Sequence, residues 1–530
     1  MGLTFTMGTR LSAALLFVSI ASVGLIHWAS LTTGHVWGDD FASYMMQARA
    51  IVEGSTREFV DANRFTIDHS PIGYAPVAYP WGFSLLLAPL YAAFNLDPFA
   101  LKFVGFACFL GFVAVLWVGM KRHHAIGWRL ALIGLVGLNP MLGSFLDELV
   151  SDIPFLLVST AGILLIGRVV VERRPIAGTF YDSVMIGAVI AVAWAIRTNG
   201  VLLIGALGAA HIVTLSSAIW SRRRSRVDGS WFESGLQEIR REWRGLVVPY
   251  GVFVVLAGAL QVMLPAAGES YTPLLSRVSS WSIRQNLHYY FDLPAEFFTG
   301  IPHERVIYGA ALPLVLMGVV ARARRDYHVI VYIALTFCLY VVWPALQGPR
   351  FILPILPFCV SFLLTGLERV TSRAELGTTG RRSILPLVFL AVCCFAYVSV
   401  DRAIGNLIRG RHTSIGPYTD EAQRLWSFIR SDVPSGSTVV FFKPRALSMF
   451  TGRQAAKITE VDQLVAGDYL GLFRIGQRQF YESHQIGASD VACLVDAGIA
   501  ELTYSSDDFT LYRLRGGIVA PGCQLASGSR

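Results

Sequence analysis

Residues 98–122 read PFALKFVGFACFLGFVAVLWVGMKR, an apolar run that contains one lysine and ends at the basic pair Lys121-Arg122. A helix needs about 20 apolar residues to cross the hydrocarbon core of a bilayer. Outside this stretch the same pattern recurs, because long uncharged runs alternate with short basic clusters. The pattern predicts a polytopic α-helical membrane protein.

The composition agrees with a bilayer as solvent. The 530 residues are 54% hydrophobic and 15% charged, and their mean hydropathy is +0.53. A soluble domain carries roughly 25% charged residues. The net charge of +8 comes from basic residues at the ends of apolar runs rather than on one surface. Cytoplasmic retention of positive charge explains this distribution, so nucleic acid is not an expected partner.

About eleven membrane-spanning helices are predicted. They cover residues 11–30, 98–120, 127–145, 153–171, 183–196, 200–220, 245–266, 306–321, 328–344, 351–368 and 384–400. The segment WGFSLLLAPLYAAFN at 81–95 is apolar but short, and it contains Pro89.

The basic clusters decide the topology. They are Arg10, Lys121-Arg122, Arg173-Arg174, Arg222-Arg223-Arg224-Arg226 with Arg240-Arg241, Arg322-Arg324-Arg325, and Arg373 with Arg381-Arg382. All of them fall on one side of the membrane if 81–95 does not cross. The positive-inside rule therefore predicts a juxtamembrane helix at 81–95, a cytoplasmic N-terminus and an extracytoplasmic tail.

Two domains are expected, a transmembrane domain at 1–400 with a long extracytoplasmic loop at 31–97, and a soluble α/β domain at 401–530. Within the tail we predict helices at 420–430, 445–450 and 490–496. A strand is expected at 437–443, and a terminal hairpin from 501–504 and 508–514. Cys493 and Cys523 could form a disulfide if this domain is exported.

Unusual charges gather on the predicted extracytoplasmic face. The acids are Asp39, Asp40, Asp147, Glu148 and Asp152, and the isolated basic residues are Arg197 and Arg350. Charges near the bilayer usually have a partner or a role, so this face is where chemistry is expected.

Asp39 and Asp40 follow the first span and open a helix that carries Arg49. Acids at a helix N-terminus are ordinarily caps that complement the helix dipole. Two consecutive acids at a membrane boundary also suit a general base with a second carboxylate that orients the acceptor or holds a divalent metal ion.

The order of motifs resembles the polyprenyl-phosphate-sugar-dependent glycosyltransferases of the GT-C superfamily, in the branch of protein mannosyltransferases and aminoarabinose transferases. The first element is the acid pair with the helix that ends Ala48-Arg49 and, after four residues, Gly54. The second is Tyr79-Pro80-Trp81-Gly82 through Pro89-Leu90, where Trp81 replaces a residue that is often Pro.

Further motifs follow in the order expected for this superfamily. They are Asn139-Pro140, Asp147-Glu148, Arg197-Thr198-Asn199-Gly200 and Gly348-Pro349-Arg350-Phe351, with Lys443-Pro444-Arg445 and Phe450-Thr451-Gly452-Arg453 in the tail. The tail resembles the exported domain of bacterial members, which implies a bacterial cytoplasmic (inner) membrane.

The resemblance implies an inverting hexosyl- or pentosyltransferase of the cell envelope. It would move a sugar from a polyprenyl-phosphate donor to a lipid, glycan or protein acceptor. Asp39 is the expected base and Asp40 its assistant. Arg350 is the first candidate for the donor phosphate, because arginine binds phosphate bidentately, and Arg197 and Arg49 come next.

Tyr79, Asp147 and Glu148 are the residues expected to bind acceptor or sugar, although the two acids could simply end a helix, and Arg197 and Arg350 could pair with acids. A transporter or flippase for a lipid-linked or small polar substrate is the main alternative. It predicts charged or broken helices near the bilayer midplane and often an internal repeat. A silent membrane scaffold is a second alternative.

Overall fold

The computed structural model describes residues 2–70, 75–172, 179–225, 231–266, 278–344, 346–373, 377–474 and 484–515. The chain forms two compact units. The first contains Met1–Leu31, Lys102–Met263 and Leu274–Gly410, and the second contains Thr32–Leu101, Leu264–Pro273 and Arg411–Arg530. The predicted domain boundary at residue 400 stays a prediction, and it falls inside the helix Gly377–Ile408.

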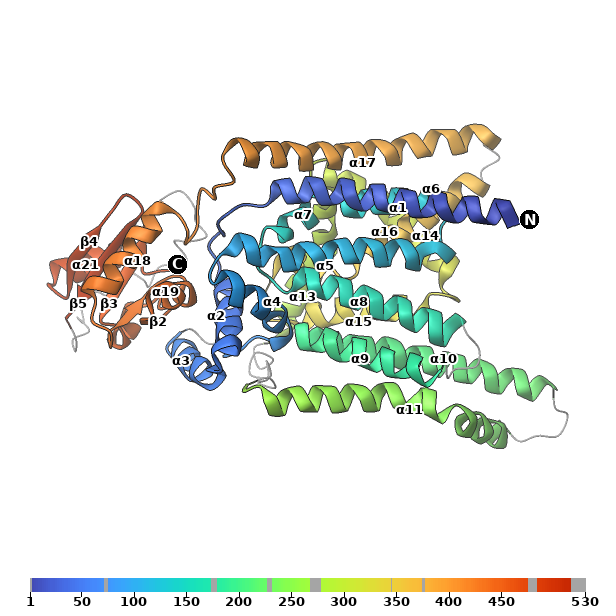
Figure 1. Ribbon diagram of the computed structural model, residues 1–530, viewed down its shortest axis with the longest axis horizontal. Coiled ribbons are helices and arrows are strands. Elements are labelled where there is room, and N and C mark those ends of the chain that lie inside the picture. Colours follow the sequence, from blue (N-terminus) through green and yellow to red (C-terminus); the bar gives the residue numbers. More distant parts are fainter. Residues whose placement is uncertain are drawn as a thin grey trace. The chain divides into compact units, whose positions relative to one another are not determined.

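The first unit is a bundle of helices, most of them long and with roughly parallel axes (Figure 1). They are α1 (Gly2–Ser30), α5 (Pro98–Gly119), α6 (Ile126–Gly137), α7 (Pro140–Leu146), α8 (Asp152–Ile166), α9 (Phe180–Ile196), α10 (Leu202–Ser225), α11 (Trp231–Met263), α13 (Ser280–Asp292), α14 (Glu304–Arg322), α15 (Tyr327–Val342), α16 (Leu356–Arg373) and α17 (Gly377–Ile408). Short η segments connect several of them, among them η2 (Gly167–Glu172), η3 (Thr198–Val201), η4 (Leu293–Phe298) and η5 (Gly348–Phe351).

Seven helices among the described residues are long and apolar enough to cross a membrane, and α6 with α7 adds an eighth if this pair, bent by 55°, is one span. Two further predicted spans correspond to α9 and α15, which are apolar but shorter. The membrane class is confirmed, whereas the number of eleven spans stays a prediction. The segment predicted to lie beside the membrane forms the 14-residue helix α4 (Trp81–Phe94).

The span predicted at 351–368 differs at its start. Residues Gly348–Phe351 form the 3-10 segment η5, and α16 begins only at Leu356. Prolines at 349 and 354 explain the difference, because proline lacks the N–H of a regular helical turn and restricts the residue before it.

Helices α14 and α16 pack closely through two glycines. A Cβ added at Gly318 would overlap the backbone carbonyl of Phe362, and one added at Gly366 would overlap that of Leu314. Small residues at such interfaces allow the backbones of membrane helices to approach each other.

The second unit contains the loop between the first two predicted spans together with the tail. The loop carries α2 (Asp40–Glu53), α3 (Thr56–Asp68) and α4. The helix after the acid pair was predicted, but α3 was not, although its hydrophobic face includes Val60.

The tail forms a five-stranded mixed sheet with strand order β2-β1-β3-β5-β4. The strands are β1 (Thr438–Val440), β2 (Gln454–Ala456), β3 (Tyr469–Phe473), β4 (Ala500–Ser505) and β5 (Phe509–Leu514). β1 pairs with β2 and β3 in parallel, and β5 pairs with β3 and β4 antiparallel. The predicted terminal hairpin is present as β4 and β5, while β2 and β3 were not predicted.

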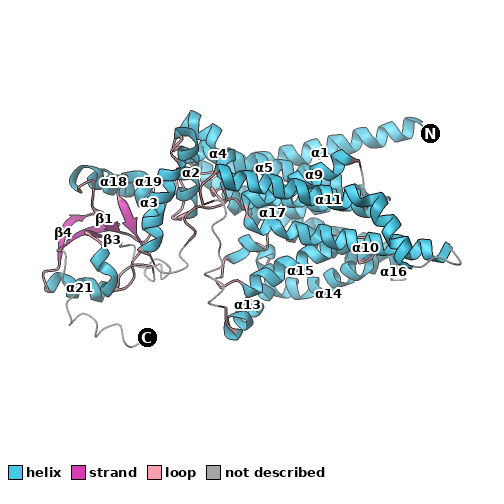
Figure 2. Cartoon of the chain, turned by 90° about the horizontal axis from the view of Figure 1, so that it is seen from below, coloured by secondary structure: helices cyan, strands magenta, loops and turns pink. Residues whose placement is uncertain are grey.

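Helices cover both faces of this sheet. Figure 2 shows α18 (Asp420–Asp432) and α19 (Pro444–Thr451) on one side and α21 (Ala488–Asp496) on the other. The three helices predicted in the tail are therefore present, and the α/β class of this domain is confirmed. Cys493 on α21 is disulfide-bonded. Cys523, like Arg173-Arg174, Arg226 and Arg530, lies outside the described residues.

Candidate active site

Trp37 anchors the segment that leads to the acid pair. Its side chain is 6% exposed, and its ring makes edge contacts with Phe442 at 5.0 Å and Phe473 at 5.9 Å between centroids. Aromatic pairs of this geometry add to the gain from burial. Trp37 therefore fixes the backbone two residues before Asp39 in the aromatic core of the second unit.

Asp39 does not use its side chain to cap α2. Its backbone carbonyl accepts the N–H of Ser43, which starts the helix, and its Oδ1 accepts the backbone N–H of Arg445 at 3.1 Å. Arg445 lies in the first turn of α19, where the N–H groups lack helical partners and favour an anion. The backbone N–H of Arg445 therefore holds the Asp39 carboxylate at the start of α19.

Asp40 has a different partner. Its Oδ1 accepts the hydroxyl of Tyr79 at 2.6 Å, a short distance typical of a hydrogen bond to a charged acceptor. The ring of Tyr79 also lies 4.9 Å from that of Tyr44. The structure thus places Tyr79, predicted to bind acceptor or sugar, on the second acid of the pair.

The side chain of Arg445 is fully buried, and the prediction of site residues missed it. Its Nε donates to Asn63 Oδ1 at 3.1 Å, its Nη2 donates to the carbonyl of Pro76, and its guanidinium lies 5.2 Å from the centre of the Tyr79 ring. The available signal was the Lys443-Pro444-Arg445 motif. Burial of this cation fixes the start of α19 beside the acid pair.

Lys457 is a second basic residue near Asp39, in addition to Arg445. Burial and, to a smaller extent, the charge of Lys443 lower the pKa of Lys457 to about 8, while the Asp39 carboxylate opposes the shift. Asp39 therefore lies within electrostatic reach of an amine that is charged at neutral pH and loses its proton near pH 8.

The first unit contains a separate cluster of one acid and two arginines. Asp152 begins α8 and its side chain is 1% exposed. Arg350 donates from Nη2 to Asp152 Oδ2 at 3.0 Å and from Nε to Oδ1 at 3.4 Å, which is the two-pronged geometry of arginine on a carboxylate. Arg197 pairs with the same Oδ1. Two arginines from distant parts of the chain thus share one buried carboxylate.

Aromatic residues fix the arginines of this cluster. Phe351 stacks on Tyr340 with ring centroids 4.1 Å apart, and Asn199 donates to the hydroxyl of Tyr340. The Arg197 guanidinium lies 5.6 Å from the centre of the Phe351 ring. The turns around positions 197 and 350, which are remote in sequence, are thus packed together in one unit.

Asp147 forms an ion pair that was not predicted. Lys102 Nζ lies 2.7 Å from Asp147 Oδ1, and the lysine side chain is completely buried. Glu148, the next residue, is half-buried. The signal for this pair was the single charge inside the apolar run 98–120, since such charges in spans usually have a partner.

Arg49 binds within its own helix. Its Nε lies 2.8 Å from Glu53 Oε1, and both side chains are about half exposed. In the structure this arginine is therefore already neutralised by the acid one turn further along α2.

No group of three or more His, Cys, Asp or Glu side chains that could hold a metal ion occurs within the described part of the chain. Asp39 and Asp40 direct one oxygen each to different donors, Arg445 N–H and the Tyr79 hydroxyl. A divalent ion on this pair would need further oxygen ligands from outside it. The predicted possible metal dependence stays a prediction.

Comparison with solved structures gives matches over nearly the whole of this chain at low identity. ArnT from Cupriavidus metallidurans in the apo state is 14% identical, covers 96% of this chain and 98% of its own, and has a TM-score of 0.54. ArnT bound to undecaprenyl phosphate is 13% identical, covers 94% and 97%, and has a TM-score of 0.56. The oligosaccharyltransferase AglB from Archaeoglobus fulgidus is 11% identical, covers 97% and 75%, and has a TM-score of 0.54.

No protein-family model matches the chain, and no curated protein matches it by sequence. The neighbours in structure are GT-C glycosyltransferases, so the resemblance predicted from the motifs is confirmed as a likeness of fold.

Proposed function

We propose that the chain is a GT-C-type glycosyltransferase. It would transfer a sugar from a polyprenyl-phosphate donor to a lipid, glycan or protein acceptor outside the cytoplasm. The observation that carries this proposal is the likeness of fold to ArnT over nearly the whole of both chains, together with the undecaprenyl phosphate bound to that protein. A transporter or flippase is not favoured, since the unusual charges described above pair near helix ends.

Asp39 is proposed as the general base. Its carboxylate is held by the backbone N–H of Arg445, and a carboxylate fixed in this way can take the proton of an acceptor hydroxyl. Asp40 and Tyr79 would orient the acceptor through their shared hydrogen bond. Lys457 supplies positive charge near Asp39 at neutral pH. Its pKa is lowered to about 8, so unlike an arginine it can lose this charge at mildly basic pH.

Arg350 and Arg197 are proposed to bind the donor phosphate. Asp152 orients both guanidiniums and so brings two arginines to one place. Arginine on a phosphate oxygen stabilises the negative charge that develops as the sugar–phosphate bond breaks. Asp147 and Glu148 remain candidates for acceptor or sugar, with Lys102 holding Asp147. Arg49 contributes least, because Glu53 already pairs with it.

The transfer reaction is tested on the purified full-length protein in nanodiscs. A panel of radiolabelled polyprenyl-phosphate hexoses and pentoses is offered, and release or transfer of label is measured with and without a metal chelator. We expect one donor to be consumed. We expect Asp39→Asn and Arg350→Ala each to lower the rate by about a hundredfold or more, the scale of a lost base or of a lost group that stabilises developing charge.

Matched controls keep this test specific. Asp61→Asn removes an exposed acid from α3 of the same unit, and Arg284→Ala removes an exposed arginine from α13. Both should keep the wild-type rate. Full activity in Asp39→Asn would refute its role as base, and a folded protein that consumes no donor would refute the proposed reaction. Loss of activity with chelator would assign a metal.

A further inference from the structure

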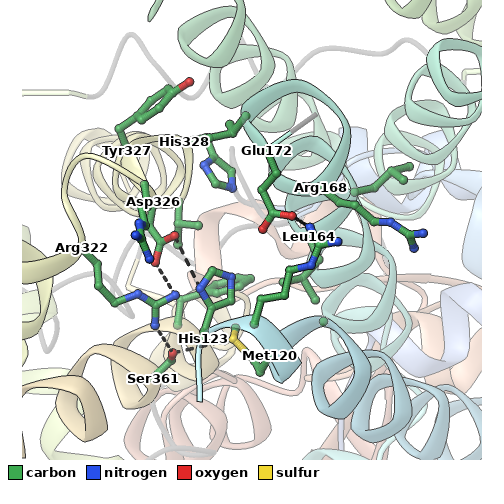
Figure 3. A pocket seen from close by; sticks show the side chains of 18 of the residues that line it. Met120, His123, Leu164, Arg168, Glu172, Arg322, Asp326, Tyr327, His328 and Ser361 are labelled. Atoms are coloured by element: carbon green, nitrogen blue, oxygen red, sulfur yellow. Dashed lines mark hydrogen bonds and ion pairs between the residues drawn. The ribbon is translucent and has the colours of Figure 1, made fainter. Parts of the chain in front are cut away.

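A cavity of about 1060 Å³ lies inside the first unit, at the end of the bundle where α5 stops and the α14–α15 connection turns (Figure 3). Its walls come from α5, α8 with η2, α10, α14, α15 and α16. Asp152 begins α8, and the first residue of this helix that lines the cavity is Ala161, so about 14 Å of helix separates the cavity from the acid–arginine cluster. The charged end of the lining, at Glu172, is about 30 Å along the helix from Asp152. The cavity is therefore distinct from the acid–arginine cluster of the same unit.

The wall changes from apolar to charged along two helices. On α8 and η2 the lining begins at Ala161 and Leu164 and ends at Arg168 and Glu172. On α5 it passes through apolar residues, Val118 among them, before the basic pair at 121–122. Both helices therefore present a hydrocarbon-like surface that leads to a charged rim, which is the polarity pattern of a lipid molecule.

The charged rim is mostly positive. Glu172 pairs with Arg122, and Asp326 pairs with Arg322 at 2.5 Å. Four further cations line the cavity, and within the described residues none of them has an ion pair: Lys121, Arg168, Arg324 and Arg325. The rim therefore has a surplus of cations that favours an anion, and both of its acids are already bound to arginine.

His328 provides an independent indication of a ligand. Its side chain is 4% exposed, and its Nδ1 has no hydrogen-bond partner within the described residues. Figure 3 shows its imidazole directed into the cavity between Glu172 and Asp326. The ring is also hydrogen-bonded to the backbone carbonyl of Ile163, so in the neutral ring the other nitrogen carries the hydrogen and Nδ1 is an acceptor. A buried polar atom without a partner is costly, and a hydroxyl of a ligand at the rim would satisfy it.

The apolar part of the cavity is open toward the outside of the bundle. Val118 of α5 and Val213 of α10 both line it and are 61% and 45% exposed. Residues Gly167–Glu172 are π-helical, a rare local widening that is frequent at functional sites. An acyl chain could thus enter from the bilayer between these helices.

We propose that this cavity binds the phosphate headgroup of an anionic glycerophospholipid, with one acyl chain along the apolar wall. Basic pockets between membrane helices on the cytoplasmic side are suited to such headgroups, and the positive-inside prediction places this end there. A zwitterionic lipid would bring a cation against the surplus of cations. Free phosphate would leave the apolar wall unfilled.

The proposal is tested by photo-crosslinking in phosphatidylcholine nanodiscs that contain a phosphatidylglycerol with a photoreactive group in its acyl chain. Cross-linked peptides of the full-length protein are identified by mass spectrometry. We expect labelling on α5, α8 and α10 beside the cavity. Unlabelled phosphatidylglycerol should compete, whereas phosphatidylcholine and glycerol phosphate should not.

Two kinds of variant separate the rim from the wall. Arg324→Ala with Arg325→Ala should weaken phosphatidylglycerol competition at least about tenfold, since each basic residue near a headgroup contributes to attraction. Ala161→Trp should abolish labelling by filling the cavity without changing charge. Arg305→Ala removes an exposed arginine from the opposite end of α14 and should change nothing.

Three results would overturn this assignment. Equal competition by phosphatidylcholine would show a cavity that does not select charge, and competition by glycerol phosphate would show a site for a soluble phosphate ester. Stronger competition by polyprenyl phosphate than by phosphatidylglycerol would make the cavity a second site for the carrier. Because none of these readouts uses glycosyl transfer, failure of the lipid site leaves the proposed function untouched.

Discussion

At the scale of single residues, the pKa of Lys457 depends on the charge of the Asp39 carboxylate. Burial disfavours the charged amine and the neighbouring Lys443 disfavours it further, so the pKa of Lys457 falls to about 8. Between pH 8 and the ordinary lysine value of about 10.4, the folded protein holds a neutral amine where the unfolded chain holds a charged one. This group's contribution to stability therefore rises with pH across that window.

We expect an amine-acylating reagent to modify Lys457 with half-maximal rate near pH 8, measured by mass spectrometry across pH. Asp39→Asn should move the midpoint to lower pH, because the Asp39 carboxylate favours the charged amine. Asp61→Asn is the control and should leave the midpoint in place. An unchanged midpoint in Asp39→Asn would show that the two groups do not interact.

The buried pair Lys102–Asp147 lets us make a second prediction at this scale. Removing one partner of a buried ion pair leaves an uncompensated charge, which costs about 3–5 kcal/mol. Lys102→Met should therefore lower the unfolding temperature markedly, whereas Arg305→Met at an exposed site should not. In the double variant Lys102→Met/Asp147→Asn part of the loss should return, and simple additivity of the two losses would contradict a direct interaction.

At the scale of helices, the α14–α16 contact depends on glycine. Gly318→Val would place a side chain against the Phe362 carbonyl, so we expect loss of monodisperse protein in detergent or a large fall in unfolding temperature. Gly309→Ala lies on the same helix, and a Cβ there meets nothing within 4 Å. The Gly309→Ala control should have the unfolding temperature of the wild type. A Gly318→Val variant as stable as the wild type would show that α14 and α16 can move apart without loss of stability.

At the scale of the whole molecule, orientation in the membrane is the property to test. The basic clusters predict that the N-terminus and the Arg322–Arg325 turn are cytoplasmic and that the tail is exported. Alkaline phosphatase fused after Arg530 should be active, and a fluorescent protein at the same position should stay dark. The opposite pair of results would reverse the topology and place the proposed lipid site on the outer face.

Much of the fold could be predicted because the bilayer acts on local composition. A span such as 98–120 must be predominantly apolar, whichever helices it later packs against. Helix signals in the tail were also local, and α18, α19 and α21 form where they were expected. The strands β2 and β3 escaped prediction because β2 has only three residues and β3 is buried along its length without alternation.

The sequence by itself determined the membrane class, the candidate acids and arginines, and the order of motifs that led to the GT-C fold. Only the tertiary structure decided which residues form hydrogen bonds and ion pairs with these acids and arginines. Asp39 meets Arg445, which is 406 residues away, and Asp152 gathers Arg197 and Arg350 from turns 45 and 198 residues distant. Hydropathy and residue spacing predict whether a segment lies in the bilayer and which secondary structure it forms. Contacts between residues so far apart in sequence exist only once the segments have packed against each other.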